Sequence, residues 1–301
     1  MAQNASFLKV AVTQSQTGTR LIDCGINIDG GLQAGLAMAR VCLAGMADVS
    51  LTPGDIAGFP GVTVQVATDH PVAACLASQY AGWAISVGDN FAMGSGPMRA
   101  HYAKEPLFNE IPYRETAQAV VGCLETRQPP DRSVLQHIAD ALKLPPAKVT
   151  LLIAPASSQA GNLQVVARSL ETALHKLHTL KFDLKQIVSG FGSAPLPPVA
   201  NKEAQAIGRT NDAILYGGRV VLWVRADDDQ LAEIGPKVPS TASKDHGEPF
   251  ADILSRAGHD FYKIDPMLFS PAMIVFHNLK TGKTHGFGRM EPEVLLRSFF
   301  A

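Results

Sequence analysis

The chain has 301 residues, of which 46% are hydrophobic and 18% charged, the balance of a globular protein with a sizeable interior. Its 26 lysines and arginines nearly equal its 27 aspartates and glutamates. This balance argues against a protein that binds nucleic acids or membrane surfaces, because such proteins carry a basic excess that meets phosphates. The length favours one large or two ordinary domains.

The first half of the chain is predicted to mix strands with helices. A hairpin around Thr17-Gly18 opens it, and Pro71 begins a helix further on. In chain order we expect strands at 7–12 and 21–26, a helix at 31–47, a strand at 62–67, and helices at 71–81, 114–126 and 132–144.

The second half shows the same mixture. We expect a strand at 149–154, helices at 161–180 and 202–215, a strand at 220–224, a helix at 249–257, strands at 273–278 and 284–289, and a last helix at 293–300. Hairpins at both ends, with helices between them, favour an α+β fold over a regular parallel sheet. The pair Pro145-Pro146 predicts an N-terminal α+β domain, 1–145, and a C-terminal α+β domain, 146–301, either of which can be discontinuous.

The cysteines and the N-terminus bear on the compartment. The four cysteines lie far apart and form no CxxC pair, which is typical of buried, reduced thiols: Cys24, Cys42, Cys75 and Cys123. No basic segment followed by an apolar stretch opens the chain, and no apolar run approaches the roughly 20 residues that span a bilayer. We therefore expect a cytoplasmic protein without a membrane or nucleic-acid partner.

Several familiar catalytic motifs are absent from the sequence. It has no dinucleotide-binding glycine fingerprint, no P-loop, no G-x-S-x-G elbow and no H-E-x-x-H pair. These absences disfavour dehydrogenases, nucleotide hydrolases, serine esterases and zincins. Hydrolases and lyases of less conspicuous chemistry remain, together with binding proteins.

A serine between two glycines, Gly94-Ser95-Gly96, is the first candidate binding element. Glycines let the backbone approach a ligand closely, and the amides can meet anionic or carbonyl oxygens. The alternative is a plain turn before Pro97. Lys104, which follows in a Lys-Glu-Pro sequence, is by itself typical of a solvated loop.

The helix expected at 161–180 carries the candidate catalytic pair. Its leucines and valines form one apolar stripe, and four polar residues fall along one flank of that stripe: Gln164, Arg168, Glu171 and His175. Arg168 and Glu171, three residues apart, form either a surface ion pair or a carboxylate that a guanidinium keeps ionised and that takes a proton from water. A rival interpretation is a metal site made by Glu171, His175 and His178, which would make the protein a metal-dependent amidohydrolase.

A second polar pair lies in the helix expected at 202–215. Asn211 and Asp212 interrupt an otherwise apolar run, which is costly unless their side chains are hydrogen-bonded. Three roles are open for this pair: capping a neighbouring helix, binding a ligand or serving an interface. A glycine-rich loop is expected at 189–195, before this helix.

Taken together, these segments resemble the methenyltetrahydromethanopterin cyclohydrolase family over nearly the whole chain. The matching segments are MGSGP at 93–97, KEP at 104–106, QVVAR at 164–168, ETA at 171–173, GRTNDAILYGG at 208–218, DFYKID at 260–265 and LFSPA at 268–272. The run at 208–218 is the most specific of them. Three residues, Met98, His101 and His246, stand where the family pattern has others, which bears on substrate detail.

The resemblance implies two α+β domains with a pterin-binding cleft between them, commonly assembled as a homotrimer. It also implies reversible hydrolysis of 5,10-methenyltetrahydromethanopterin, or its dephospho form, to 5-formyltetrahydromethanopterin without a metal or organic cofactor. By likeness, Arg168 and Glu171 match the catalytic pair, and Lys104 matches a further contributor. The substrate-binding residues that we expect are Gly94, Ser95, Gly96, Gln164, Asn211 and Asp212.

The chemistry is consistent with that implication. The substrate carbon bridges two nitrogens in an amidinium-like cation, so it is electrophilic without a Lewis acid. In our hypothesis Glu171 removes the proton from the attacking water, and Arg168 orients Glu171 and stabilises charge. The alternatives to this enzyme are the metal-dependent amidohydrolase, a pterin carrier without catalysis and a structural subunit.

Overall fold

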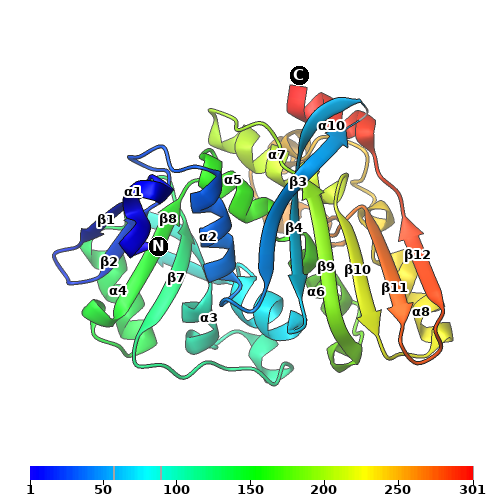
Figure 1. The fold of residues 1–301 in the computed structure, drawn as a ribbon, viewed down its shortest axis with the longest axis horizontal. Helices are drawn as coiled ribbons and strands as arrows, with labels where there is room; N and C mark the ends of the chain where they lie inside the picture. The colour runs from blue at the N-terminus through cyan, green and yellow to red at the C-terminus, as the bar shows by residue number, and fades with distance from the viewer. Residues whose placement is uncertain (57, 89, 301) are drawn as a thin grey trace. The chain divides into compact units, whose positions relative to one another are not determined.

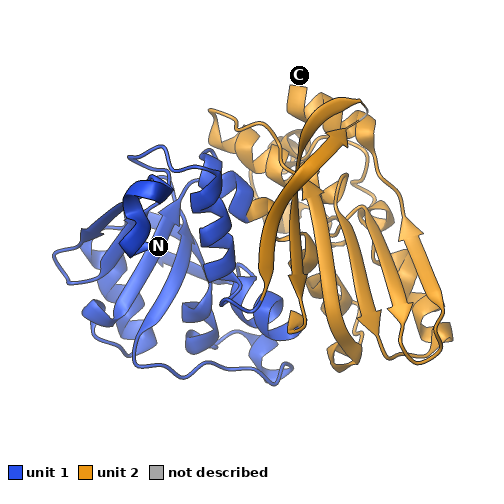
Figure 2. Ribbon diagram, in the orientation of Figure 1, with its two compact units in different colours: residues 1–46, 72–164 blue, residues 47–71, 165–301 orange. Residues whose placement is uncertain are grey.

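The computed structural model describes residues 1–56, 58–88 and 90–300. The chain divides into two compact units, residues 1–46 with 72–164 and residues 47–71 with 165–301 (Figure 2). Both units mix helices with a six-stranded sheet, so the expected α+β fold is confirmed. Both are discontinuous, since residues 47–71 join the second unit, and the boundary expected after residue 145 falls inside the first unit.

The first unit is built on a mixed sheet (Figure 1). Its strands are, in sheet order, β1 (Ala11–Gln14), β2 (Arg20–Asp23), β8 (Val149–Ala154), β7 (Val120–Glu125), β6 (Asn90–Ser95) and β5 (Trp83–Val87). The three central strands β2, β8 and β7 are parallel, and the outer pairs are antiparallel. The hairpin expected at Thr17-Gly18 therefore forms between β1 and β2.

Helices pack on both faces of this sheet. They are α1 (Ala5–Leu8), α2 (Leu32–Cys42), a π-helix (Val72–Gln79), α3 (Pro97–Tyr102), α4 (Arg132–Leu142) and α5 (Gln159–Val166). Successive residues of β8 point to opposite faces, as the two-residue period of a strand requires: Leu151 and Ile153 pack with α4, and Leu152 packs with α2. The sheet is therefore buried on both sides.

The second unit has its own mixed sheet. Its strands are, in sheet order, β12 (Thr284–Gly288), β11 (Met273–Asn278), β10 (Arg219–Val224), β9 (Ile187–Pro195), β4 (Phe59–Thr68) and β3 (Asp48–Ile56). Only β10 and β11 are parallel. The helices are α6 (Ser169–Thr179), α7 (Glu203–Leu215), α8 (Asp228–Ile234), α9 (Phe250–Arg256) and α10 (Pro292–Phe300). The helix α6 packs against β9 and β10, and α7 packs against α9 and α10.

Some predicted elements differ from the structure. Residues 7 and 8 lie in α1, so the first strand begins only at Ala11. The helix expected at 114–126 is wrong: Val120–Glu125 is the central strand β7, whose short apolar run fits a doubly buried parallel strand equally well. The glycine-rich loop expected at 189–195 is wrong as well, because these residues belong to β9.

Other predicted elements are confirmed. The strands at 149–154 and 273–278 have the expected bounds, and α4, α7, α9 and α10 lie within two residues of theirs. All four cysteine side chains are buried thiols. Within residues 1–56, 58–88 and 90–300, no helix is both long and apolar enough to cross a membrane.

Candidate functional site

Arg168 lies in a turn between two helices and Glu171 lies in the first turn of the second helix, so the single helix expected at 161–180 is wrong. The helix α5 ends at Val166, and α6 begins at Ser169. Arg168 is the N-cap of α6, and its amide donates to the carbonyl of Val165 at 3.0 Å. The expectation of one helix fails here although neither glycine nor proline occurs at the break.

This break changes the electrostatics around Glu171. In one continuous helix its carboxylate would lie in the middle, but in α6 it lies in the first turn, at the third residue. The unpaired amides and the dipole of a helix N-terminus stabilise a negative charge by about 0.3–1 kcal/mol, and by up to about 2 kcal/mol where partly buried. Because the Glu171 side chain is only 4% exposed, this stabilisation acts where water screens little.

Two glycines of β9 let the first turn of α6 lie close to the sheet. A methyl group on Gly192 would come within 2.7 Å of the Ser169 hydroxyl oxygen and 2.8 Å of the Leu170 nitrogen. A methyl group on Gly190 would come within 2.8 Å of a Leu170 methyl carbon. These glycines therefore permit close packing of strand and helix, and they do not form the loop that their sequence predicts.

A buried lysine, which the sequence reasoning missed, ties α6 to a distant segment. The ammonium group of Lys176 donates to the carbonyl of Met267, which lies between two of the family-like segments. Burial lowers the pKa of Lys176 to about 8, and the nearby Asp265 charge opposes this shift. The available signal was its position three residues after Ala173 and beside Leu177, on the edge of the apolar stripe.

The Gly94-Ser95-Gly96 segment is a strand end and a helix cap. Gly94 and Ser95 close β6, and Gly96 is the N-cap of α3 with φ 88°, a conformation that favours glycine. The amide of Gly96 donates to the carbonyl of Ser78 at 2.8 Å, and the buried Ser95 hydroxyl lies 3.2 Å from the thiol of Cys42. Both groups are therefore engaged inside the first unit.

Lys104 follows α3, and its side chain is exposed. Five residues earlier in the chain is Arg99, the largest fully buried side chain of the described residues, whose guanidinium forms a two-point ion pair with Glu105. Sequence reasoning missed this arginine. The signal was a charged residue in the apolar stretch MRA, six residues before a glutamate.

Asn211 and Asp212 both lie on α7, as expected. The Asn211 amide group donates to the Ile207 carbonyl of its own helix at 2.8 Å. The fully buried Asp212 carboxylate accepts from the amide of Phe250 at 2.8 Å, at the start of α9, and from the Ser298 hydroxyl of α10. Of the three roles left open by the sequence, the structure shows helix capping for Asp212.

Burial raises the pKa of the Asp212 carboxyl to about 7, and the two hydrogen bonds only partly offset this shift. Gln164 lies in α5, and its side chain is buried as well. The remaining polar residues of the candidate set thus lie on helices, and not on loops.

The rival metal site receives no geometric support. No three histidine, cysteine, aspartate or glutamate side chains in the described part of the chain are grouped so that they could hold a metal ion. The expected set of Glu171, His175 and His178 is included in that finding, since all three residues are described.

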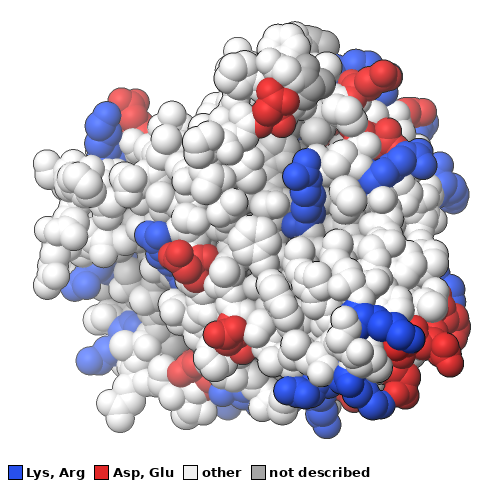
Figure 3. Space-filling view, turned by 45° about the vertical axis from the view of Figure 1, so that its right-hand side comes forward, with Lys and Arg blue, Asp and Glu red and all other residues white. Residues whose placement is uncertain are grey.

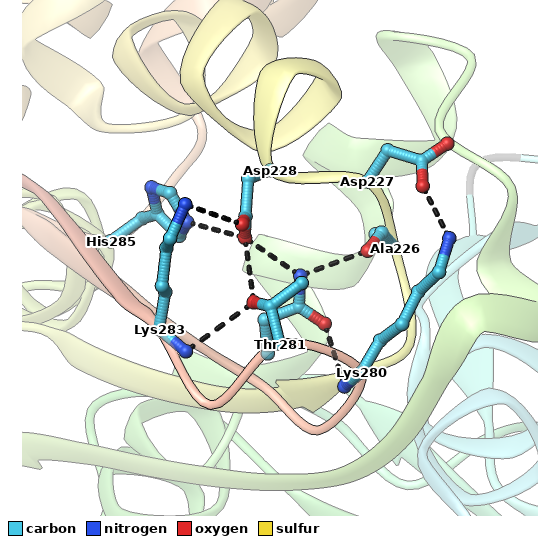
Figure 4. Close-up of polar contacts among 8 residues, drawn as sticks. Ala226, Asp227, Asp228, Lys280, Thr281, Lys283 and His285 are labelled. Atoms are coloured by element: carbon cyan, nitrogen blue, oxygen red, sulfur yellow. Dashed lines mark hydrogen bonds and ion pairs between the residues drawn. The ribbon is translucent and has the colours of Figure 1, made fainter.

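A separate polar network surrounds Asp228, the first residue of α8 (Figure 4). Its carboxylate accepts hydrogen bonds from side chains of Asn278, Thr281 and His285 at 2.9–3.0 Å and pairs with Lys283 at 3.1 Å. These donors all come from β11, β12 and the turn between them, so one carboxylate holds the hairpin to the start of α8. On the face drawn in Figure 3, cationic and anionic side chains likewise lie beside one another.

Comparison with known proteins identifies the class of the chain. A family model described as Cyclohydrolase (MCH) matches residues 1–299, which assigns the chain to a family of hydrolytic enzymes. Three similar proteins, each named methenyltetrahydromethanopterin cyclohydrolase, cover most of its length. The protein of Rhodopirellula baltica is 47% identical over 94% of this chain and 86% of the relative. That of Methylobacterium sp. is 46% identical over 99% and 94%, and that of Methanosarcina barkeri is 43% identical over 97% and 92%.

Both the match to the family model and the sequence identities of 43–47% point to the same family. The chain belongs to the methenyltetrahydromethanopterin cyclohydrolase family, and it is an enzyme.

Proposed function

We propose that this protein reversibly hydrolyses 5,10-methenyltetrahydromethanopterin, or its dephospho form, to 5-formyltetrahydromethanopterin. The names of its relatives support the substrate. The observation that carries the mechanism is the position of Glu171, a buried carboxylate in the first turn of α6, three residues after Arg168 at the N-cap position of this helix.

In the proposed reaction Glu171 acts as the general base. It accepts a proton from water as the water oxygen bonds to the methenyl carbon, and it passes that proton to the departing nitrogen as the carbon–nitrogen bond breaks. The remaining hydroxyl proton of the intermediate is released to solvent as the formyl carbonyl forms. Arg168 orients the carboxylate and stabilises the oxygen of the tetrahedral intermediate. Because the methenyl carbon of the cation is already electrophilic, the reaction as proposed uses no metal and no organic cofactor.

We propose Lys104 as a further catalytic contributor, supported by the match of its segment to the family pattern. The same likeness supports Gln164, Asn211 and the backbone of residues 94–96 as contacts to the edge of the pterin. Asp212 contributes through the position of its neighbour Asn211, because its own carboxylate caps α9. By family likeness we also propose a cytoplasmic homotrimer. Light scattering on the purified protein gives its molar mass and so tests the trimer.

The test compares the wild type with Glu171→Gln in chelator-treated buffer, following the loss of methenyl-pterin absorbance. A positioned general base contributes roughly 10²–10⁴ in rate, so Glu171→Gln should lose about that factor in kcat while still binding the substrate. Glu293→Gln is the matched control, because Glu293 also lies in the first turn of a helix, α10, but is exposed. Near-normal turnover by Glu171→Gln would refute the assignment, and turnover only after metal is restored would favour the amidohydrolase.

A further inference from the structure

A buried arginine determines the backbone position of an exposed lysine in the first unit. The Arg99 guanidinium donates from Nε and Nη2 to the two carboxylate oxygens of Glu105, at 2.7 and 2.6 Å. A paired, two-point contact of this kind fixes the direction of both side chains as well as their distance. Glu105 is therefore held from within the unit.

The remaining donors of Arg99 bind the π-helix. Nη1 donates to the carbonyls of Leu76 and Ala77, which lie in the last turn of that helix. The guanidinium carbon also lies 4.8 Å from the ring centre of Tyr80 and 5.0 Å from that of Phe108, within the range of cation–π attraction. One side chain thus joins α3, the π-helix and the segment that follows α3.

Lys104 lies between two points that are both bound to Arg99. On its N-terminal side, the amide of Ala103 donates to the Arg99 carbonyl at 2.9 Å, and Ala103 has the left-handed φ of 43° that turns the chain out of α3. On its C-terminal side, the Glu105 carboxylate is paired with the Arg99 guanidinium. The backbone on both sides of residue 104 is therefore fixed, although the lysine side chain itself is exposed.

Two neighbouring residues complete this arrangement. A methyl group on Gly82 would come within 2.0 Å of a Glu105 carboxylate oxygen, so only glycine leaves room for the pair. Arg114 holds the same segment from the outside, where it donates to the carbonyls of Ala103 and Phe108 at 3.3 and 2.8 Å. An ordinary solvated loop would need neither contact.

We propose that Arg99 and Glu105 are positioning residues that hold Lys104 in place for its contact with the substrate. The inference rests on the proposed role of Lys104 and extends it, because it assigns function to a buried pair that does not itself touch the pterin. Preorganisation of this kind affects catalysis strongly, since a shift of about 1 Å in a functional group can lower a rate by about 10²-fold.

The test is a double-mutant cycle on kcat with Lys104→Met, Glu105→Gln and the double variant. We expect each single variant to lower kcat by about tenfold or more, and the double variant to be no slower than Lys104→Met alone. Lys143→Met, at the exposed C-cap of α4, is the control for the loss of a surface lysine in the same unit. An equal loss from Glu105→Gln with and without Lys104 would overturn the positioning role, because a merely structural defect acts in both backgrounds.

Hydrogen exchange provides a readout without substrate. Glu105→Gln should exchange faster at residues 103–108 and at the wild-type rate in α4, and unchanged exchange at 103–108 would overturn the inference. If Glu105→Gln does not fold, Arg114→Met replaces it in both measurements, since it loosens the same segment and leaves no buried charge unpaired. Wild-type kcat in Lys104→Met would also overturn the inference, whereas a failure of the proposed reaction would show as an inactive wild type.

Discussion

Glu105 in the first unit and Asp228 in the second have side chains that are both 17% exposed, but the cations paired with them differ in their access to water. Glu105 is paired with an arginine that is 0% exposed, beneath two aromatic rings. Asp228 gathers more partners, but its lysine partner Lys283 has a side chain that is 68% exposed (Figure 4).

This difference shows that the number of polar contacts does not by itself determine how much they contribute to the free energy of unfolding. Charges at the surface interact through water, so most exposed ion pairs contribute only about 0–1 kcal/mol. A charge inside the protein is not hydrated, so removing its partner leaves a buried charge without any compensating interaction. We therefore expect the network with fewer charged partners, around Arg99, to matter more for stability. Four substitutions test this order.

The largest expected effect comes from Arg99→Met. The change leaves the Glu105 carboxylate without its cation and two carbonyls of the π-helix without their donor. Loss of one partner of a fully buried pair costs about 3–5 kcal/mol. Because the remaining Glu105 side chain is 17% exposed, we expect the free energy of unfolding to fall by about 3 kcal/mol or less, which a urea titration measures. The control is Arg256→Met, at the exposed pair with Glu248, and a loss of the same size there would contradict the comparison.

Asp212→Asn tests a carboxyl that is buried without a cation, and its effect should be smaller because a carboxyl can give up its charge by binding a proton. Burial raises the Asp212 pKa from 3.8 to about 7, so the folded state binds more protons than the unfolded state between about pH 4 and 7. The free energy of unfolding should therefore fall as the pH rises through this window. The Asn variant should lack this contribution, and identical pH profiles for the two proteins would contradict the account.

Asp228→Asn should have a smaller effect that is present above about pH 4 and disappears in acid. Hydrogen bonds from His285, Asn278, Lys283 and Thr281 hold the pKa of Asp228 well below its usual range. A lowered pKa gives stability that is present above the ordinary aspartate pKa of about 4 and is lost as the pH falls further. Thermal melts of both proteins should thus converge in acid, and a difference that persists at the lowest pH would argue against the charge as its cause.

The smallest effect is expected for Lys280→Ala. Lys280 pairs with Asp227, and both side chains are more than half exposed. We expect a loss of about 0–1 kcal/mol, which 1 M salt should largely remove because the Debye length is then about 3 Å. A salt-independent loss would show that the lysine contributes through packing instead.

The sequence predicts a helix or strand correctly where its residue pattern fits only one type of secondary structure. The hairpin at Met273–Asn278 and Thr284–Gly288 combines alternating residues with a Thr-Gly turn, and α4 combines an apolar stripe with the capping residue Asp131. The strand β7 was missed because a short apolar run serves a buried helix and a parallel strand equally well. Tertiary pairing with β8 decides between them, and it cannot be read locally.

The candidate site shows the same limit. The spacing of Arg168 and Glu171 fits a surface ion pair as well as a catalytic pair, and only the family resemblance favours the catalytic pair. No local signal marks the helix break at Ala167 and Arg168. The glycines of β9 predict a loop when read alone, and their role becomes clear only against α6. Arg99 was missed because the value of a buried charge depends on carbonyls and rings that come from other segments.

Residues 47–71 belong to the second unit although residues 72–164 of the first unit follow them in the chain, and this order affects folding during synthesis. The strand β4 ends at Thr68, but its neighbour β9 begins only at Ile187. At about 5–20 residues per second, a ribosome leaves the β3–β4 hairpin without that neighbour for several seconds while the first unit is completed. An open strand edge invites aggregation, and Pro53 and Pro60 remove amide donors from this hairpin outside Thr63–Thr68, the part of β4 that pairs with β9. The nascent hairpin thus carries proline protection along only part of its length while it waits for β9.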